Sequence, residues 1–347
     1  MDICVVILTK DEKLHIGRCL DRIAALSPRQ VCVVDCFSTD GTQRIVEEWK
    51  SGGVGEWRSG GVGTAAEFRR RALEKVEETP RLMPLAEAVE TVVHRQVAAG
   101  SNPSTQGSIS NAALGRKGGG NGVFLVEHEW PGNQAAQFQW ALDNLPIETK
   151  WILRLDADEY LTNELISEIS DKLPQMDDDV DGVVLKRRHV VGWLGNRWIK
   201  RGMYPTKILR LFRKGHGRSD MKIMDEHIVV QRRVVELEHD FVDHSLISFE
   251  EWKEKHRNYA KREAQSYLSG ERSTGEKAAK KDAYYKLPRY FRAVAYFCIR
   301  YFLKLGFLDG VAGFRWHFWQ GLWYRWIVDR EIAYHKRILK QPKKELV

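Results

Sequence analysis

The chain has 347 residues and a mass of 40.1 kDa, with 43% hydrophobic and 29% charged residues. This length and composition are those of a folded protein with one large domain or two, and they exclude a disordered chain. The formal net charge is +8, and the excess lies at the C-terminal end, where residues 250–347 hold 22 Lys and Arg against 11 Asp and Glu. A basic end indicates an anionic partner, such as a nucleic acid, a phosphate-rich ligand or an anionic membrane.

The first residues, MDICVVILTKDE, lack a basic n-region, and their apolar run stops at Thr9, so we expect no signal peptide. No stretch reaches the roughly 18 apolar residues that a membrane-spanning helix needs. The five cysteines form no CxxC pair, which favours free thiols in a reducing cytoplasm.

Strand and helix patterns alternate along the first part of the chain. Short apolar runs predict buried strands at 3–9, 31–35, 122–130, 151–156, 181–193 and 208–214, with one or two more in 227–239. Helical spacing of apolar residues predicts helices at 13–26, 42–49, 135–145 and 164–173. The alternation predicts an α/β fold with a parallel sheet, and from residue 250 the chain becomes helical, basic and aromatic.

Residues 50–121 interrupt this alternation. SGGVG occurs at 51–55 and again at 59–63, and RKGGGNG closes the segment at 116–122. We interpret 50–121 as an inserted, mobile helical segment on glycine-rich hinges, without an evident function.

Polar residues follow three of the predicted strands, at Thr9–Glu12, Asp35–Asp40 and Asp156–Glu159. In parallel α/β sheets, ligands bind at this carboxyl edge. The last group, DADE, admits three interpretations: a turn with helix-capping acids, a divalent-metal site, or a catalytic pair. Asp156 and Asp158 are two residues apart, and carboxylate oxygens suit Mg²⁺ or Mn²⁺, which share their coordination with substrate phosphates. On spacing alone, the metal site and the turn are equally supported.

Several segments together resemble glycosyltransferase family 2. They are, in chain order, VVILTKDE, VVDCFSTDGT, LRLDADEYL, RGMYPTKILRLFRK, MDEH, LEHDFVDH, EEWKEKHRNYAKREA and GFLDGVAGF. The later ones resemble the bacterial subgroup that extends the lipopolysaccharide core or related glycans. Members are inverting nucleotide-sugar transferases whose DxD motif holds a metal on the donor diphosphate. The resemblance implies a GT-A-like, mostly parallel sheet flanked by helices in residues 1–249, and a helical, aromatic and basic extension in 250–347.

The resemblance also implies roles for the residues at the strand ends. Those that match nucleotide contacts are Thr9, Asp11, Glu12, Asp35, Asp40 and Asp156, and those that match the DxD metal ligands are Asp156 and Asp158. Many relatives carry a second acid directly after the one that matches Asp35. This chain has Cys36 there, which leaves the identity of the base open.

Inversion needs a base on the acceptor side, because a sugar hydroxyl is a poor nucleophile until it is deprotonated. Glu226 matches the family's catalytic acid, and the neighbouring Asp225 is the alternative. His244 matches a histidine that follows the base in relatives, either as a third metal ligand or as a structural residue. Candidate cations for the diphosphate, each weighed against plain surface charge, are Lys186, Arg188, Arg201 and Arg210.

The C-terminal aromatic residues admit two interpretations. Trp316, Trp319, Trp323 and Trp326 are spaced three, four and three residues apart, which puts them on one helical face. Residues 290–308 mix Phe, Tyr and Leu with Arg292, Arg300 and Lys304. A core-packing helix pair explains this, but Trp and Tyr among cations suit a membrane interface. We favour peripheral contact with the inner face of the plasma membrane from the cytoplasm, where a lipid-linked acceptor is presented. No nucleic-acid module is evident, so we expect no such partner.

The sequence therefore predicts a metal-dependent inverting hexosyltransferase that uses a UDP-sugar, with glucose favoured, on a lipid-linked glycan of the lipopolysaccharide core or an exopolysaccharide. The first rival is a nucleotidyltransferase, but LTKDEKLH has no glycine and two acids where a triphosphate loop is expected. The second is a non-catalytic scaffold at a membrane surface.

Overall fold

The computed structural model describes residues 1–51, 122–221, 226–270 and 282–339. These residues belong to one compact unit. The second unit, residues 60–118, lies outside the described residues, and with it most of the insertion expected at 50–121.

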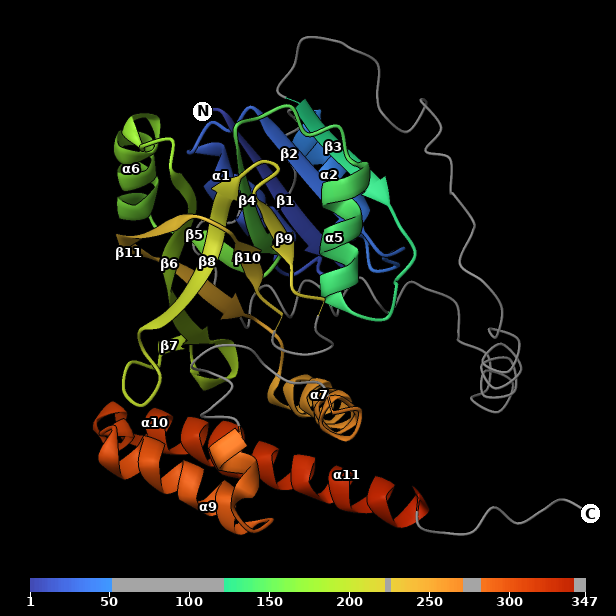
Figure 1. Cartoon of the computed structure of the whole chain (residues 1–347), viewed down its shortest axis with the longest axis vertical. Helices are drawn as coiled ribbons and strands as arrows, with labels where there is room; N and C mark the ends of the chain where they lie inside the picture. The colour runs from blue at the N-terminus through green and yellow to red at the C-terminus, as the bar shows by residue number, and fades with distance from the viewer. Residues whose placement is uncertain (52–121, 222–225, 271–281, 340–347) are drawn as a thin grey trace, which may run out of the picture. The chain divides into compact units, whose positions relative to one another are not determined.

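The described strands form a nine-stranded sheet of order β3–β2–β1–β4–β8–β6–β11–β5, with β7 paired to β6, and a separate pair, β9–β10 (Figure 1). Their bounds are β1 Ile3–Thr9, β2 Gln30–Asp35, β3 Gly122–Glu127, β4 Trp151–Asp156, β5 Glu159–Leu161, β6 Val180–Val191, β7 Arg197–Trp198, β8 Thr206–Arg213, β9 Gly217–Ser219, β10 Ile228–Val230 and β11 Arg233–Ser245. The four neighbouring strands β3, β2, β1 and β4 pair in parallel, whereas β8 pairs antiparallel with both β4 and β6. The α/β class is confirmed, and the sheet is mixed because β8 and β5 run against their neighbours.

Helices cover both faces of the sheet. Alternate residues of β1 point to opposite faces, so Ile3, Val5 and Ile7 pack in one core and Cys4, Val6 and Leu8 in the other. The first core is covered by α1 (Ile16–Ala24), α2 (Thr42–Lys50) and α6 (Asn163–Lys172), and the second by α5 (Gln134–Asn144). These strands read as continuous apolar runs because both of their faces are buried.

The register brings the polar strand ends together at one edge of the sheet. Thr9 pairs with Asp35, Leu8 with Asp156, and Asp35 with Glu127. At the other half of the sheet, Asp243 of β11 pairs with His189 of β6 and with Glu159 of β5. The carboxylates that the sequence distributes over the chain therefore share one edge, because β1 to β4 pair in parallel and β5, which is antiparallel to β11, begins at this edge.

The chain after β11 is helical. The bounds are α7 Phe249–Leu268, α9 Phe291–Cys298, a π-helical turn Ile299–Leu303, a 3₁₀ turn Gly306–Asp309, α10 Gly310–Trp316, a π-helical segment His317–Trp323 and α11 Tyr324–Leu339. A capping box starts α7: the Ser248 hydroxyl accepts from the Glu251 N–H at 3.2 Å, and the Glu251 carboxylate accepts from the Ser248 N–H at 2.6 Å. Because the cap lies three residues beyond β11, it fixes where α7 leaves the site edge of the sheet.

The tryptophan stripe is mainly a packing surface. Trp316 is 3% exposed and packs with Val191, Ile199 and Trp252. Trp319 and Trp323 extend this cluster, and only Trp326 of the four is exposed. The part of this face that carries Trp316, Trp319 and Trp323 packs against α7 and the sheet, and only its end at Trp326 points outward.

No helix among the described residues is both long enough and apolar enough to cross a membrane. All five cysteines are free thiols, and four of them are buried.

Candidate functional site

Arg154 links the predicted metal ligand to the predicted base. On β4, Arg154 and Asp156 are two residues apart and therefore lie on the same face of the sheet. The side chain of Arg154 is 3% exposed, and its Nη2 lies 2.5 Å from Oε1 of Glu226 and 3.6 Å from Oδ1 of Asp156. Glu226 precedes β10 and is far from DADE in sequence, so this contact places the expected acid beside the expected metal ligand. Asp225 lies outside the described residues.

Arg210 engages the other oxygen of Asp156. Its guanidinium lies 3.2 Å from Oδ2 of Asp156 and also forms an ion pair with the buried carboxylate of Glu159. Glu159 in turn accepts the backbone N–H of Asp156 at 3.0 Å, which shapes the turn after β4. Burial acts to raise the pKa of Asp156, but Arg210 and Arg154 outweigh it and hold that pKa below the ordinary value. Arg210, expected as a surface charge or a phosphate ligand, is instead a buried partner of the DADE turn.

Asp158 lies in an acidic group with Asp243 and Glu12. Burial raises the pKa of Asp158 to about 6, and the carboxylates of Asp243 and Glu12 add to this effect. Burial likewise acts on Asp243, but His189 at 3.2 Å and Arg187 at 3.4 Å hold its pKa below the ordinary value. Such a concentration of negative charge at one edge requires a nearby cation.

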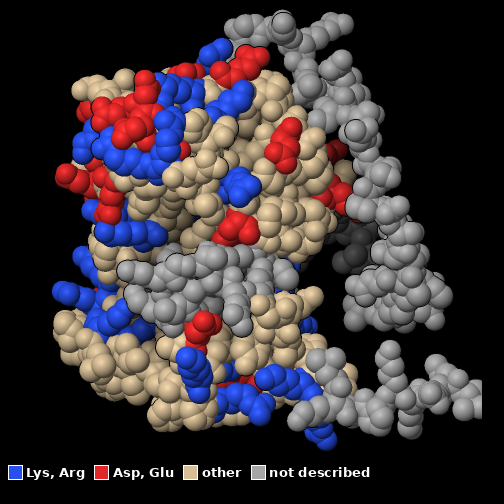
Figure 2. All heavy atoms as spheres, viewed as in Figure 1, with Lys and Arg blue, Asp and Glu red and all other residues tan. Residues whose placement is uncertain are grey.

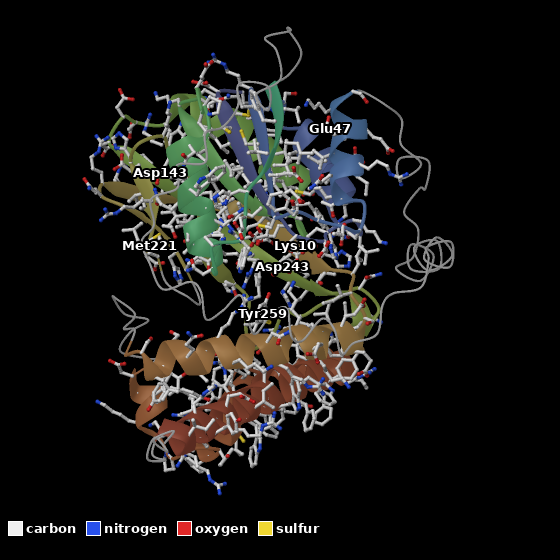
Figure 3. All side chains as sticks on the ribbon, turned by 90° about the vertical axis from the view of Figure 1, so that its right-hand side faces the viewer. Lys10, Glu47, Asp143, Met221, Asp243 and Tyr259 are labelled. Atoms are coloured by element: carbon white, nitrogen blue, oxygen red, sulfur yellow. The ribbon has the colours of Figure 1, made fainter. Side chains whose placement is uncertain are left out.

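Lys255 of α7 is such a cation. Burial acts to lower its pKa, yet Tyr259 and the carboxylates of Asp158, Glu12 and Asp243 together raise it above the ordinary value. Figure 3 shows Tyr259 on the side of α7 that faces Asp243 and Lys10 at the strand ends. The helix after β11 thus brings positive charge to the carboxylate edge.

His244 is held by two hydrogen bonds. Its Nδ1 accepts from Arg18 at 3.0 Å, and its Nε2–H donates to Oδ1 of Asn196 at 2.8 Å. Burial and the Arg18 guanidinium lower the pKa of His244 to about 3, so the ring is neutral. Arg18 also donates to the backbone oxygens of His244 and Asp158. Because both ring nitrogens are occupied, this geometry supports the structural role of His244 and leaves no nitrogen free for a metal.

The residues matched to nucleotide contacts join two neighbouring loops. The oxygens of Asp35 accept from the Thr9 hydroxyl at 3.2 Å and from the Ser38 N–H at 2.8 Å. Three further residues make bonds between these loops: Asp11 accepts from the Thr39 N–H, Asp40 accepts from the Lys13 N–H, and Glu12 donates its N–H to Thr42. These contacts hold the loops after β1 and β2 against each other.

The residues at the end of β4 fit a divalent ion that is held by only one or two protein carboxylates. Oδ1 of Asp156 is buried without a hydrogen-bond partner, although Nη2 of Arg154 lies 3.6 Å away, and Asp158 supplies carboxylate oxygens from the turn that follows. Within the described ranges, no group of three or more His, Cys, Asp or Glu residues is arranged to hold a metal. One or two carboxylates suffice for Mg²⁺ when substrate phosphates and water complete its shell.

Sequence reasoning misses Arg154 and Lys255, and only Arg154 has a signal in the sequence. Arg154 is the one charged residue in the apolar run WILRL that precedes Asp156, and a buried strand tolerates arginine only with a partner. Lys255 stands among six other charged residues in EEWKEKHRNYAKREA up to Lys261, so composition does not distinguish it. Its importance follows only from the direction of α7.

No model of a known protein family matches the chain, and a search of curated proteins found no match. Among solved structures, the mannosyltransferase PcManGT from Pyrobaculum calidifontis, in complex with GDP-Man and Mn²⁺, is 14% identical, with 96% of this chain and 88% of that chain covered and a TM-score of 0.46. S. aureus TarS 1–349 in complex with UDP-GlcNAc is 12% identical, with 97% and 92% covered and a TM-score of 0.39. A further structure of S. aureus TarS is 15% identical with a TM-score of 0.34, and the alignment covers 75% of this chain and 39% of that one. Because all these TM-scores are below 0.5, no residue role is transferred from these structures.

Proposed function

We propose that the protein is an inverting glycosyltransferase. It would transfer a hexose, with glucose favoured, from a nucleoside-diphosphate sugar, with UDP favoured, to a lipid-linked glycan of the lipopolysaccharide core or an exopolysaccharide. The observation that carries the proposal is the ion-paired chain Asp156–Arg154–Glu226 at the carboxyl edge of β4, beside Asp158 and Lys255. It would combine groups that bind a diphosphate with a carboxylate that accepts a proton.

The donor would lie along the strand ends, with its diphosphate near Asp156 and Asp158. Asp156 and Asp158 would hold Mg²⁺ or Mn²⁺, which neutralises charge on the diphosphate as a Lewis acid when bound. Lys255 adds a positive charge from α7, and Arg154 adds one from β4. The loops after β1 and β2, with Thr9, Asp11, Glu12, Asp35 and Asp40, would border the nucleoside.

Glu226 would act as the base. It takes the proton of the acceptor hydroxyl while that oxygen forms a bond to the anomeric carbon. The bond from this carbon to the diphosphate oxygen breaks on the opposite side, the electron pair leaves with the diphosphate, and the configuration inverts. The ion pair with Arg154 orients Glu226, and the general-base contribution is typically about a hundredfold or more.

The donor site is tested by thermal unfolding of the full chain with UDP, GDP and ADP, each with and without Mn²⁺. A ligand that binds the native state raises its stability, by about 2.7 kcal/mol at a hundred times Kd. We expect a Mn²⁺-dependent rise with UDP in the natural protein and none in Asp158→Ala. Asp143→Ala removes an exposed carboxylate of α5, away from the site edge (Figure 3), and should keep the rise.

Each outcome separates the candidate functions. A rise with GDP or ADP alone keeps the enzyme class and changes the donor. Release of pyrophosphate instead of a nucleoside diphosphate during turnover would support a nucleotidyltransferase. If no nucleotide changes the melting temperature, or if Asp158→Ala responds like the natural protein, the donor-site proposal fails and the scaffold becomes the better explanation.

A further inference from the structure

The turn between α9 and α10 exposes many large apolar side chains. Of the nineteen large hydrophobic side chains exposed in the described chain, eleven lie between residues 287 and 314. They are Leu287, Phe291, Val294, Ile299, Phe302, Leu303, Leu305, Phe307, Leu308, Val311 and Phe314. Leu303 and Val311 are each 77% exposed, the highest values among these residues.

Part of this set forms one continuous surface around Tyr301. The ring of Tyr301 lies 5.1 Å from that of Phe302, 6.2 Å from that of Phe307 and 5.8 Å from that of Phe314, measured between centroids. Leu303, Leu308 and Val311 lie beside these residues in sequence. We call residues 302–314 the apolar turn. Soluble monomers rarely expose so many adjoining apolar side chains without a partner.

The exposed charged side chains around the apolar turn are all cations. Exposed cations in the described residues 286–315 are Lys286, Arg289, Lys304 and Arg315. The acid of the apolar turn, Asp309, is engaged, because its Oδ2 accepts the backbone N–H groups of Lys200 and Arg201 at 2.9 and 2.8 Å. Figure 2 shows that the described surface over α9 and α10 is largely uncharged on this face.

The exposed residues differ from those that the sequence predicts at a membrane interface. Arg292 and Arg300, expected at a membrane interface, are buried: Arg292 forms an ion pair with Asp329, and Arg300 donates to the Gly202 carbonyl at 3.2 Å. The tryptophan stripe packs inward, as described above. The exposed apolar surface is the turn between the helices, not the face that carries the tryptophans.

We infer that the apolar turn binds the surface of an anionic lipid bilayer, with Leu303, Leu308 and Val311 entering the acyl boundary and Lys304 and Arg315 at the headgroups. Short apolar segments flanked by cations bind in this way without spanning the bilayer. Contact between two copies through the apolar turn would bring Lys304 and Arg315 near their counterparts, with no unengaged acid of the apolar turn to pair them. The charges therefore favour anionic lipid over a second copy. This inference does not rest on the proposed donor chemistry.

Flotation of the full chain with vesicles of phosphatidylcholine, with and without phosphatidylglycerol, tests the inference. We expect binding that increases with phosphatidylglycerol and weakens with salt. The double substitution L303S/V311S should reduce the vesicle-bound fraction at least about tenfold. V229S/V234S removes two exposed valines of β10 and β11, outside the apolar turn, and should bind as the natural protein does.

Charge is tested separately. Lys304→Glu should weaken binding to phosphatidylglycerol vesicles. The control is Lys261→Glu, which changes an exposed lysine of α7 and should leave binding unchanged. Sedimentation velocity tests the alternative that a second copy of the chain covers the apolar turn. If the natural protein is a dimer and L303S/V311S is a monomer, the bilayer inference is overturned. Equal flotation of the natural protein and L303S/V311S would overturn it as well. A UDP-dependent rise in melting temperature that persists in L303S/V311S separates this inference from the donor site.

Discussion

Lys255 of α7 brings a positive charge to the carboxylates at the strand ends, which the sequence does not predict. Burial acts to lower its pKa, but Tyr259 and the carboxylates of Asp158, Glu12 and Asp243 outweigh that effect. A partly buried cation near carboxylates either neutralises them permanently or shares its charge with an anionic ligand. The two roles can be distinguished, because a substitution of Lys255 weakens the binding of a diphosphate only if Lys255 contacts it.

We predict that Lys255→Met weakens binding of UDP by about tenfold to a hundredfold, because a charge-assisted contact of about 1.5–3 kcal/mol is lost. Titration calorimetry with UDP and with UMP provides the measurement. A direct contact with the diphosphate predicts a larger loss for UDP than for UMP.

Lys255→Arg, which keeps the charge, should recover part of the affinity, and Lys261→Met on the same helix is the matched control. Equal losses for UDP and UMP would show that Lys255 only balances Asp158 and Asp243. Unchanged binding of both nucleotides would remove Lys255 from the donor site.

The strand ends were predictable because their signal is local. A buried parallel strand needs an apolar run, and the run stops where the chain reaches the edge, so Thr9, Asp35 and Asp156 follow from the sequence alone. Side-chain partners were not predictable, because they depend on the approach of distant elements. His244 is hydrogen-bonded by Arg18 of α1, and Glu226 forms an ion pair with Arg154 of β4. The tryptophan spacing predicts a shared face, but core and membrane faces have the same period.

Glu168 of α6 fixes this helix to β11. The pairing of β11 with β6 shifts register between Glu236 and Asp240, which frees the N–H groups of Glu238 and His239. Glu168 of α6 accepts both, at 2.9 Å each, and also binds Lys172 at 2.7 Å. Burial acts to raise the pKa of Glu168, but these hydrogen bonds outweigh it and lower the pKa to about 2. One carboxylate therefore satisfies the irregular part of β11.

We predict that Glu168→Gln lowers the free energy of unfolding at pH 7 by about 3 kcal/mol, from roughly 1.4 kcal/mol per pKa unit. The folded-state pKa is depressed, so this stability is present above the unfolded-state pKa of 4.5 and is lost as pH falls toward 2. Urea unfolding between pH 7 and pH 3 should therefore show the difference between natural protein and variant decrease with acidification. Asp171→Asn, an exposed acid on α6, is the control and should show no such dependence. A difference that stays constant with pH would contradict the role of the charge.

At the scale of the whole described unit, the C-terminal helices are joined to the sheet through a close contact at Gly202. His317 is fully buried between Gly202, which precedes β8, and Gly306 of the 3₁₀ turn. Its Nε2–H donates to the Arg201 carbonyl at 3.1 Å. Gly202 has φ +82, and a Cβ there would lie 2.6 Å from Cε1 of His317 and 2.8 Å from the Arg300 carbonyl oxygen. Two glycines thus allow the helices that carry the apolar turn to reach the sheet that carries the site.

We predict that Gly202→Ala destabilises the protein by about 2–4 kcal/mol, of which the left-handed backbone accounts for about 1–2 kcal/mol and the contact with His317 for the rest. Gly195→Ala is the matched control, because Gly195 has φ +74 and nothing lies within 4 Å of the Cβ position. The difference between the two variants in urea unfolding measures the contact between helices and sheet alone. If that contact is part of one cooperative unit, Gly202→Ala should lower a single transition in which fluorescence and circular dichroism coincide. If the two variants lose equal stability, or if Gly202→Ala separates the probes into two transitions, the C-terminal helices fold independently, and lipid binding by the apolar turn would then be uncoupled from the stability of the site.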